Sequence, residues 1–152
     1  LLQNLYFLSG NTMDELDKQD KRIAAILNED EPPEVTYETL RKYVTHLRAN
    51  IVLPCSLTGI EDFDWEERYV IGGGDKKEYE KLKKTRPSYT DVFSLLSFSD
   101  DVDEMYGIFV KVKRASDKKQ FTLPLADLEV IDINSSNFQL VNDFSVWFVN
   151  NS

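Results

Sequence analysis

Two short stretches of the sequence concentrate carboxylate side chains. The first follows SLTGI and contains Glu61, Asp62 and Asp64. The second lies within SFSDDVDEMYG and contains Asp100, Asp101, Asp103 and Glu104. Carboxylates this close repel one another, and Ca²⁺ binds about six to eight oxygen ligands, for which clustered acids and turn carbonyls are suitable. The two stretches are therefore candidate calcium sites.

Neither stretch has the ligand order of an EF-hand loop, in which the fifth residue is an oxygen ligand, the sixth is glycine and the twelfth is glutamate. In a loop that starts at Asp101, Met105 occupies the fifth position. In a loop that starts at Asp62, Glu67 replaces the glycine and Gly73 replaces the glutamate. An EF-hand is excluded, and spacing alone favours solvated acidic turns over a metal site.

Other kinds of site have little support in the sequence. Cys55 is the only cysteine and His46 the only histidine, which excludes an intramolecular disulfide and a Cys/His zinc or iron–sulfur centre within one chain. No nucleophile motif accompanies His46, and the stretch GGGDKKEYEKLKKTRP lacks the order of a phosphate-binding loop. We expect no enzymatic activity.

Composition and charge limit the classes of partner. The 152 residues suit one ordinary domain, and a hydrophobic content of 41% is that of a folded chain. The formal charge of -9, from 27 acidic and 18 basic residues, opposes binding to nucleic acid or to an anionic membrane and fits a basic protein partner better. No apolar run approaches the ~20 residues that cross a bilayer. With a lone cysteine and no leader-like segment, we expect a soluble, cytoplasmic protein.

The chain is expected to divide into three parts. Residues 1–12 include NLYFLSG, which resembles an engineered protease-recognition sequence, and we interpret them as a vector-derived tag. Residues 13–34 are predicted to form an N-terminal helix and the acidic linker EDEPPE, because its two prolines cannot continue a helix. Residues 35–152 are predicted to form a single α+β domain.

Hydrophobic spacing predicts the elements of that domain. Apolar residues at helical spacing predict a helix that Thr36 caps and that ends near residue 49, and a second helix over 136–149. Residues 50–60, 68–71 and several short segments between 88 and 132 are typical of β-strands. The expected fold class is a small, strongly curved antiparallel β-sheet or SH3-like barrel with flanking helices on its N- and C-terminal sides.

Three segments carry a resemblance to a known family. TYETLRKYVTHLRANIVLPCSLTG, GIFVKVKRASDKKQFTLPLADLEVID and LVNDFSVWF occur in this order and resemble the small cyanobacterial-type calcium-binding proteins, the CcbP-like family. The resemblance spans roughly residues 35–149. It implies a barrel-like domain with flanking helices that binds Ca²⁺ without catalysis, as a buffer or a sensor. It also implies that the carboxylates of the two acidic stretches are the ligands.

A second interpretation assigns the same surface to a protein partner. A small β-barrel could serve as an interaction module without a specific metal, with its acidic turns facing a basic protein and with Phe63, Trp65 or Tyr106 as aromatic anchors. A calcium site should select Ca²⁺ over Mg²⁺, whereas an interaction module should show little ion selectivity.

Overall fold

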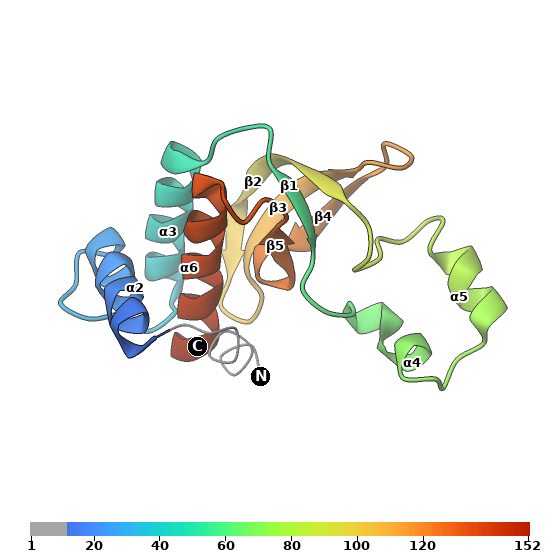
Figure 1. The fold of residues 1–152 in the computed structure, drawn as a ribbon, viewed down its shortest axis with the longest axis horizontal. Coiled ribbons are helices and arrows are strands. Elements are labelled where there is room, and N and C mark those ends of the chain that lie inside the picture. Colours follow the sequence, from blue (N-terminus) through green and yellow to red (C-terminus); the bar gives the residue numbers. More distant parts are fainter. Residues whose placement is uncertain (1–11) are drawn as a thin grey trace.

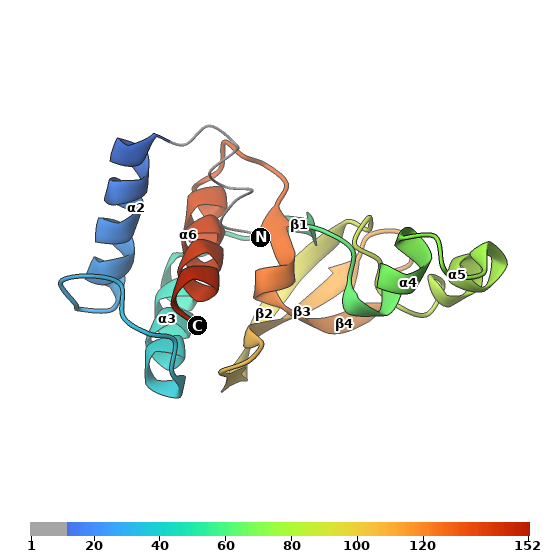
Figure 2. The ribbon, with the colours of Figure 1, turned by 90° about the horizontal axis from the view of Figure 1, so that it is seen from below.

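The computed structural model describes residues 12–152, so all but the last residue of the predicted tag lies outside the described part of the chain. Figures 1 and 2 show three regions: helices α2, α3 and α6 at one end, a curved β-sheet in the middle, and helices α4 and α5 in a lobe at the other end. The helices are α2 (Met13–Ile26), α3 (Tyr37–Asn50), α4 (Glu67–Val70), α5 (Lys76–Leu82) and α6 (Ser136–Asn151), with 3₁₀ turns η1 (Asp64–Glu66) and η2 (Leu125–Asp127). The strands are β1 (Ser56–Gly59), β2 (Phe93–Asp103), β3 (Gly107–Arg114), β4 (Gln120–Pro124) and β5 (Leu128–Val130).

The five strands form one antiparallel sheet in the order β4-β3-β2-β1-β5. Its curvature has a local cause in β2, where the register against β3 shifts between Leu95 and Ser97 and again between Phe98 and Val102. Extra residues on one strand bend it and increase its twist. The predicted α+β class is confirmed, but within residues 12–152 the sheet is not closed, so the SH3-like barrel is not confirmed.

The core lies between the sheet and helices α3 and α6. Thr36 caps α3 as predicted, because its side chain accepts a hydrogen bond from the amide of Thr39. Tyr43 of α3 stacks on Trp147 of α6 with ring centroids 5.0 Å apart, and both side chains are fully buried. The Trp147 indole also donates a 2.8 Å hydrogen bond to the Pro33 carbonyl. The predicted apolar faces of these two helices therefore form the packing surface.

Helix α2 packs on the outer side of this helical layer. Buried Asp143 of α6 accepts hydrogen bonds of 2.9 and 3.0 Å from the Arg22 guanidinium and one of 3.0 Å from the Gln19 amide. Ile23 and Ala24 are buried next to these polar contacts. No helix among the described residues is long and apolar enough to span a membrane.

Two predicted strands differ from the structure. Residues 68–71 belong mainly to helix α4, and the strand expected over 50–60 is confined to Ser56–Gly59. The β-rich sequence ERYVI does not pair with the sheet, since it lies in the lobe between β1 and β2. The local preference for a strand is overridden there by tertiary position.

Candidate metal site

Strand pairing positions the first acidic stretch. Because β1 pairs antiparallel with β5, with Gly59 opposite Leu128, the residues that leave β1 run beside those that enter β5. The Ile60 amide donates a 3.0 Å hydrogen bond to the Asp127 carbonyl, which fixes the two segments together. A cavity of about 80 Å³ lies between them. Four carboxylates line this cavity: Glu61, Asp62, Asp64 and Asp127. We call this set the first acidic cluster.

Asp127 shows the electrostatic character of the first acidic cluster. Its side chain remains accessible to solvent, but the surrounding chain removes part of its hydration. This desolvation raises the pKa of the Asp127 carboxyl from its ordinary value of 3.8 to about 6, and repulsion from Asp64 and Glu61 adds to the increase. A carboxyl with a raised pKa beside other acids lacks a compensating positive charge. A bound cation would supply that charge.

The second acidic stretch lies at the far end of β2 and in the turn to β3. Asp100 forms a 2.7 Å ion pair with Arg48, which also donates to the Phe98 and Ser99 carbonyls at 3.1 Å. Asp101 is exposed in the irregular part of β2. Asp100 therefore already has a cationic partner from α3.

The turn residues of this stretch also have protein partners. An Asp103 carboxylate oxygen accepts hydrogen bonds from the amides of Met105 at 2.7 Å and Tyr106 at 2.9 Å, which closes the turn. Glu104 accepts a 3.2 Å hydrogen bond from the amide of Tyr37 at the start of α3. Three of the four acids in the second stretch therefore have protein partners: Asp103 closes the turn, and Asp100 and Glu104 join the end of β2 and the turn to α3.

The structure does not bring the two acidic stretches together. The first follows β1, whose residues Ser56 and Leu57 pair with the start of β2, whereas the second lies at the end of the same long strand. Within residues 12–152, no group of three or more His, Cys, Asp or Glu side chains has an arrangement that could hold a metal ion as it stands. The seven predicted ligands remain predictions, and a cation would have to draw carboxylates closer together.

Asp127 is the member of the first acidic cluster that sequence reasoning missed. It lies in LPLADLEVID, a segment that the resemblance emphasised for its apolar residues. Its position opposite residues 60–64 depends on a pairing between strands about seventy residues apart, which no local pattern indicates.

The aromatic anchors proposed for a protein partner differ in exposure. Phe63 is 7% exposed and belongs to the core, whereas Tyr106 is 48% exposed, as that interpretation requires.

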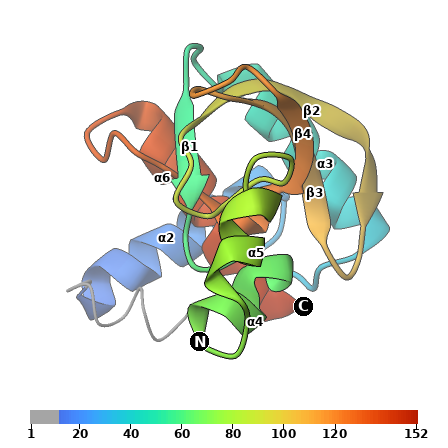
Figure 3. The same ribbon diagram turned by 90° about the vertical axis from the view of Figure 1, so that its right-hand side faces the viewer.

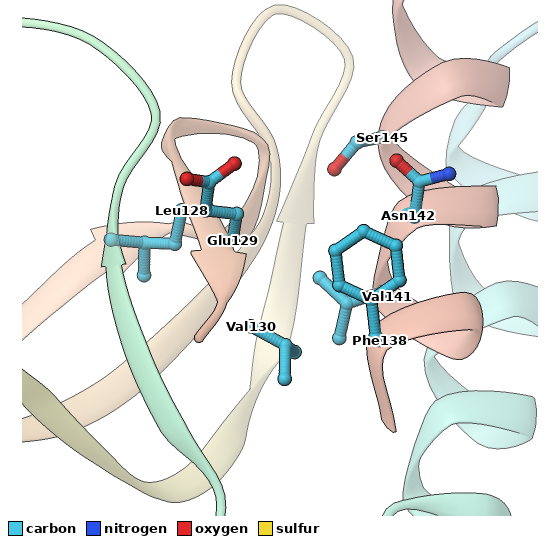
Figure 4. A pocket seen from close by; sticks show the side chains of 7 residues that line it. All are labelled: Leu128, Glu129, Val130, Phe138, Val141, Asn142 and Ser145. Carbon is cyan, nitrogen blue, oxygen red and sulfur yellow. The ribbon is translucent and has the colours of Figure 1, made fainter. Parts of the chain in front are cut away.

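A second cavity lies beside the strand that follows Asp127. Figure 4 shows it between β5 and α6, with the Glu129 side chain on one side and those of Asn142 and Ser145 on the other. Its volume of about 20 Å³ is room for about one water molecule. This cavity belongs to the packing of α6 on the sheet and is too small for a larger ligand.

Comparison with known proteins relates this fold to a class of proteins. Residues 76–148 match the model of a family described by its calcium binding, the CcbP family. The crystal structure of Anabaena CcbP has a TM-score of 0.56 at 15% identity, over 86% of this chain and 89% of that chain. A structure described as a calcium-binding protein in its calcium-binding form has a TM-score of 0.57 at 15% identity, over 88% of this chain and 91% of that chain. No curated protein matches.

The chain therefore shares its fold with Anabaena CcbP and with the calcium-binding protein of the second structure. The match of residues 76–148 to the CcbP family agrees with the resemblance in the sequence.

Proposed function

We propose that this protein binds Ca²⁺ without catalysis, as a buffer or a sensor, and that the first acidic cluster is its principal site. The observation that carries this proposal is the convergence of four carboxylates on one cavity, one of which has its pKa raised to about 6. The family-model match supports the choice of ion. Calcium takes carboxylate oxygens in flexible arrangements, so a site without a rigid cage suits it better than it suits Mg²⁺.

The residues of the cluster would supply charge and oxygen ligands from two segments of the chain. Glu61, Asp62 and Asp64 lie on the loop after β1, and Asp127 lies on η2. A bound cation would relieve the repulsion among them and hold the loop against η2. Because the cation binds the ordered protein and not the unfolded chain, it would stabilise the fold by mass action.

The second acidic stretch is the weaker candidate. Asp100 is neutralised by Arg48, and Asp103 and Glu104 accept backbone hydrogen bonds. A cation there would meet the positive charge of Arg48 and would share Asp103 and Glu104 with the backbone amides. We assign this stretch a secondary role, as a low-affinity calcium site.

Calorimetry of protein that lacks residues 1–11 tests the proposal. Saturable binding of Ca²⁺ at micromolar to low-millimolar concentration, with little response to Mg²⁺, is the expected result. We expect the double variant Asp64→Asn/Asp127→Asn to weaken calcium binding at least about tenfold, because it removes two of the four charges. The matched double variant Asp101→Asn/Asp103→Asn should change the affinity by less than about threefold, since the amide oxygen of an asparagine in place of Asp103 can still accept the turn hydrogen bonds.

Two results would contradict the proposal. Equal weak heats for Ca²⁺ and Mg²⁺ would leave the acids as a solvated surface, and a larger loss in Asp101→Asn/Asp103→Asn than in Asp64→Asn/Asp127→Asn would move the principal site to the β2–β3 turn.

The β2–β3 turn also supports a second candidate function, an interface for a basic protein in the cytoplasm. Tyr106 and Met105 are 48% and 76% exposed, and the neighbouring Asp101 and Glu104 are exposed as well. Apolar anchors with an acidic rim suit a basic, partly apolar partner. Binding of such a partner should weaken steeply with added salt, because the attraction between exposed charges is screened.

A further inference from the structure

Residues 65–87 form a lobe that projects from the sheet. The lobe contains the end of η1 and helices α4 and α5. Figures 1 and 2 show that it lies apart from α2, α3 and α6, and Figure 3 views the molecule from the side of the lobe. Its interior is aromatic: Tyr69 and Tyr79 stack with centroids 5.0 Å apart, and Trp65 lies across both rings at 6.2 and 5.7 Å. So small a cluster buries little apolar surface, and the attachment of the lobe must depend on its roots.

The two roots of the lobe lie beside each other. The Gly59 amide donates a 3.0 Å hydrogen bond to the Tyr89 carbonyl, which joins the end of β1 to the segment that returns to β2. The Thr58 hydroxyl donates to the same carbonyl at 3.2 Å and to the Asp91 carbonyl at 2.8 Å. The outgoing root contains residues 61–64, so the first acidic cluster lies where the lobe leaves the body of the protein.

A buried carboxylate, that of Glu66, fastens the lobe to these roots. Glu66 is fully buried. One of its oxygens accepts hydrogen bonds from the hydroxyls of Tyr79 at 2.6 Å and Ser88 at 2.7 Å. The other accepts from the amides of Tyr89 at 2.8 Å and Phe63 at 3.4 Å. A buried carboxylate is tolerated when donors satisfy it in this way, and with four donors Glu66 is not free to bind a cation.

Glu66 thus connects the segment that contains the candidate ligands to the lobe through a direct hydrogen bond. Phe63 lies between Asp62 and Asp64, and its amide donates to the same Glu66 oxygen that receives the Tyr89 amide. The Glu66 amide in turn donates a 2.8 Å hydrogen bond to the Phe63 carbonyl. A movement of residues 62–64 toward a cation must therefore change the position or the hydrogen bonds of Glu66, and through it those of Tyr79 and the returning segment.

We propose that the lobe is the element that responds to cation binding, and that Glu66 transmits occupancy of the first acidic cluster to it. The inference rests on the proposed function, since it takes the first acidic cluster as the site. Without a cation, repulsion among the acids loosens residues 61–64 and the hydrogen bond to Phe63. With a cation, this segment is held in place and Glu66 fastens the lobe more firmly. The protein is then a sensor whose signal is the order of the lobe.

Coupling between calcium binding and attachment of the lobe must be reciprocal. If calcium tightens the attachment of the lobe by some factor, a substitution that loosens the attachment must weaken calcium binding through the same coupling. Tyr79→Phe removes the 2.6 Å hydrogen bond to Glu66 and keeps the ring that stacks on Tyr69. Tyr69→Phe is a matched control in the same stacked pair, because the Tyr69 hydroxyl donates to exposed Glu78 and does not touch Glu66.

Hydrogen exchange with and without Ca²⁺, combined with calorimetry, tests the inference. In the unsubstituted protein, calcium should slow exchange of the amides of residues 65–87 by about fivefold or more, and should change those of α3 by less than about twofold. Tyr79→Phe should weaken calcium binding by about fivefold, and Tyr69→Phe by less than about twofold. If Tyr79→Phe does not fold, the exchange of the unsubstituted protein decides by itself.

The outcomes separate this inference from the proposed function. Saturable calcium binding with no change in exchange of the lobe, or equal affinities of Tyr79→Phe and Tyr69→Phe, would overturn the inference and leave calcium binding in place. A lack of saturable binding by the unsubstituted protein would overturn both.

Discussion

Replacing Asp127 by asparagine should stabilise the protein when no cation is bound. The carboxyl of Asp127 has its pKa raised from 3.8 to about 6 by desolvation and by the charges of Asp64 and Glu61. At about 1.4 kcal/mol per pH unit, this difference corresponds to an upper limit of about 3 kcal/mol. Because the side chain is accessible to solvent, which screens its charge, we expect about 1 kcal/mol and a rise in Tm of about 3 °C.

The dependence on pH follows from the direction of the pKa change. Folded protein holds the proton on Asp127 more tightly than unfolded protein does. The stability that this proton contributes is therefore fully present below pH 3.8 and is lost as the pH rises through about 6. An asparagine side chain in this place resembles the protonated carboxyl at every pH, so the advantage of Asp127→Asn should be largest at pH 7.5 and small at pH 4.

Thermal unfolding in EDTA at pH 7.5 and pH 4 measures this difference. Asp101→Asn is the matched control, since the Asp101 side chain is exposed and makes no hydrogen bond or ion pair within residues 12–152. Its Tm should stay within about 1 °C of the unsubstituted protein. The reasoning would be refuted if Asp127→Asn were less stable than the unsubstituted protein at pH 7.5, or if its advantage were the same at both pH values. With excess Ca²⁺, the order of stability at pH 7.5 should reverse.

Two further substitutions test how the lobe is attached. Arg114 is 3% exposed, pairs with Asp91 and Asp117, and donates hydrogen bonds to the carbonyls of residues 83, 84 and 86. Arg114→Met should therefore lower the free energy of unfolding, measured in urea titrations, by about 3 kcal/mol. The control Lys111→Met, at an exposed position, should change it by less than about 0.5 kcal/mol. A Cβ on Gly59 would lie 2.6 Å from atoms of Tyr89, so Gly59→Ala should lower the free energy of unfolding by about 1–3 kcal/mol. A Cβ on Gly73 would have its nearest contact at 3.3 Å, so the control Gly73→Ala should lower it by less than about 1 kcal/mol. If a variant and its control lost equal amounts of unfolding free energy, the contacts described for Arg114 or for Gly59 would not hold the lobe in place.

Local patterns predicted the helical layer well. The apolar stripe of residues 37–49 and the cap at Thr36 depend on neighbours within one or two turns, and α3 has both. The lobe could not be predicted in the same way. Arg68–Ile71 has strand-forming residues, but the segment lies mainly in α4, where Tyr69 stacks on Tyr79 of α5, ten residues further along the chain.

Spacing along the sequence was a poor guide to which acids lie together in space. Asp100, Asp101, Asp103 and Glu104 are dense in sequence, but they lie along a strand end and a turn, where backbone amides and Arg48 engage three of them. The first acidic cluster gains its fourth carboxylate, Asp127, only through the pairing of β1 with β5. The density of acids in the sequence therefore indicated both stretches as candidate calcium sites, but it could not indicate which of them would bind calcium more tightly.

The ranking follows from where the chain has placed its own positive charges. Among the ion pairs of residues 12–152 none involves a member of the first acidic cluster, whereas Asp100 is paired with Arg48. The base beside a paired carboxylate repels an incoming cation, and this repulsion subtracts from the affinity. Carboxylates left without a base keep their full attraction for an external cation, at the expense of the stability of the cation-free protein. The pKa of Asp127 is raised first by desolvation and then by repulsion from Asp64 and Glu61, and no base offsets either effect. For this reason we propose the first acidic cluster as the preferred calcium site.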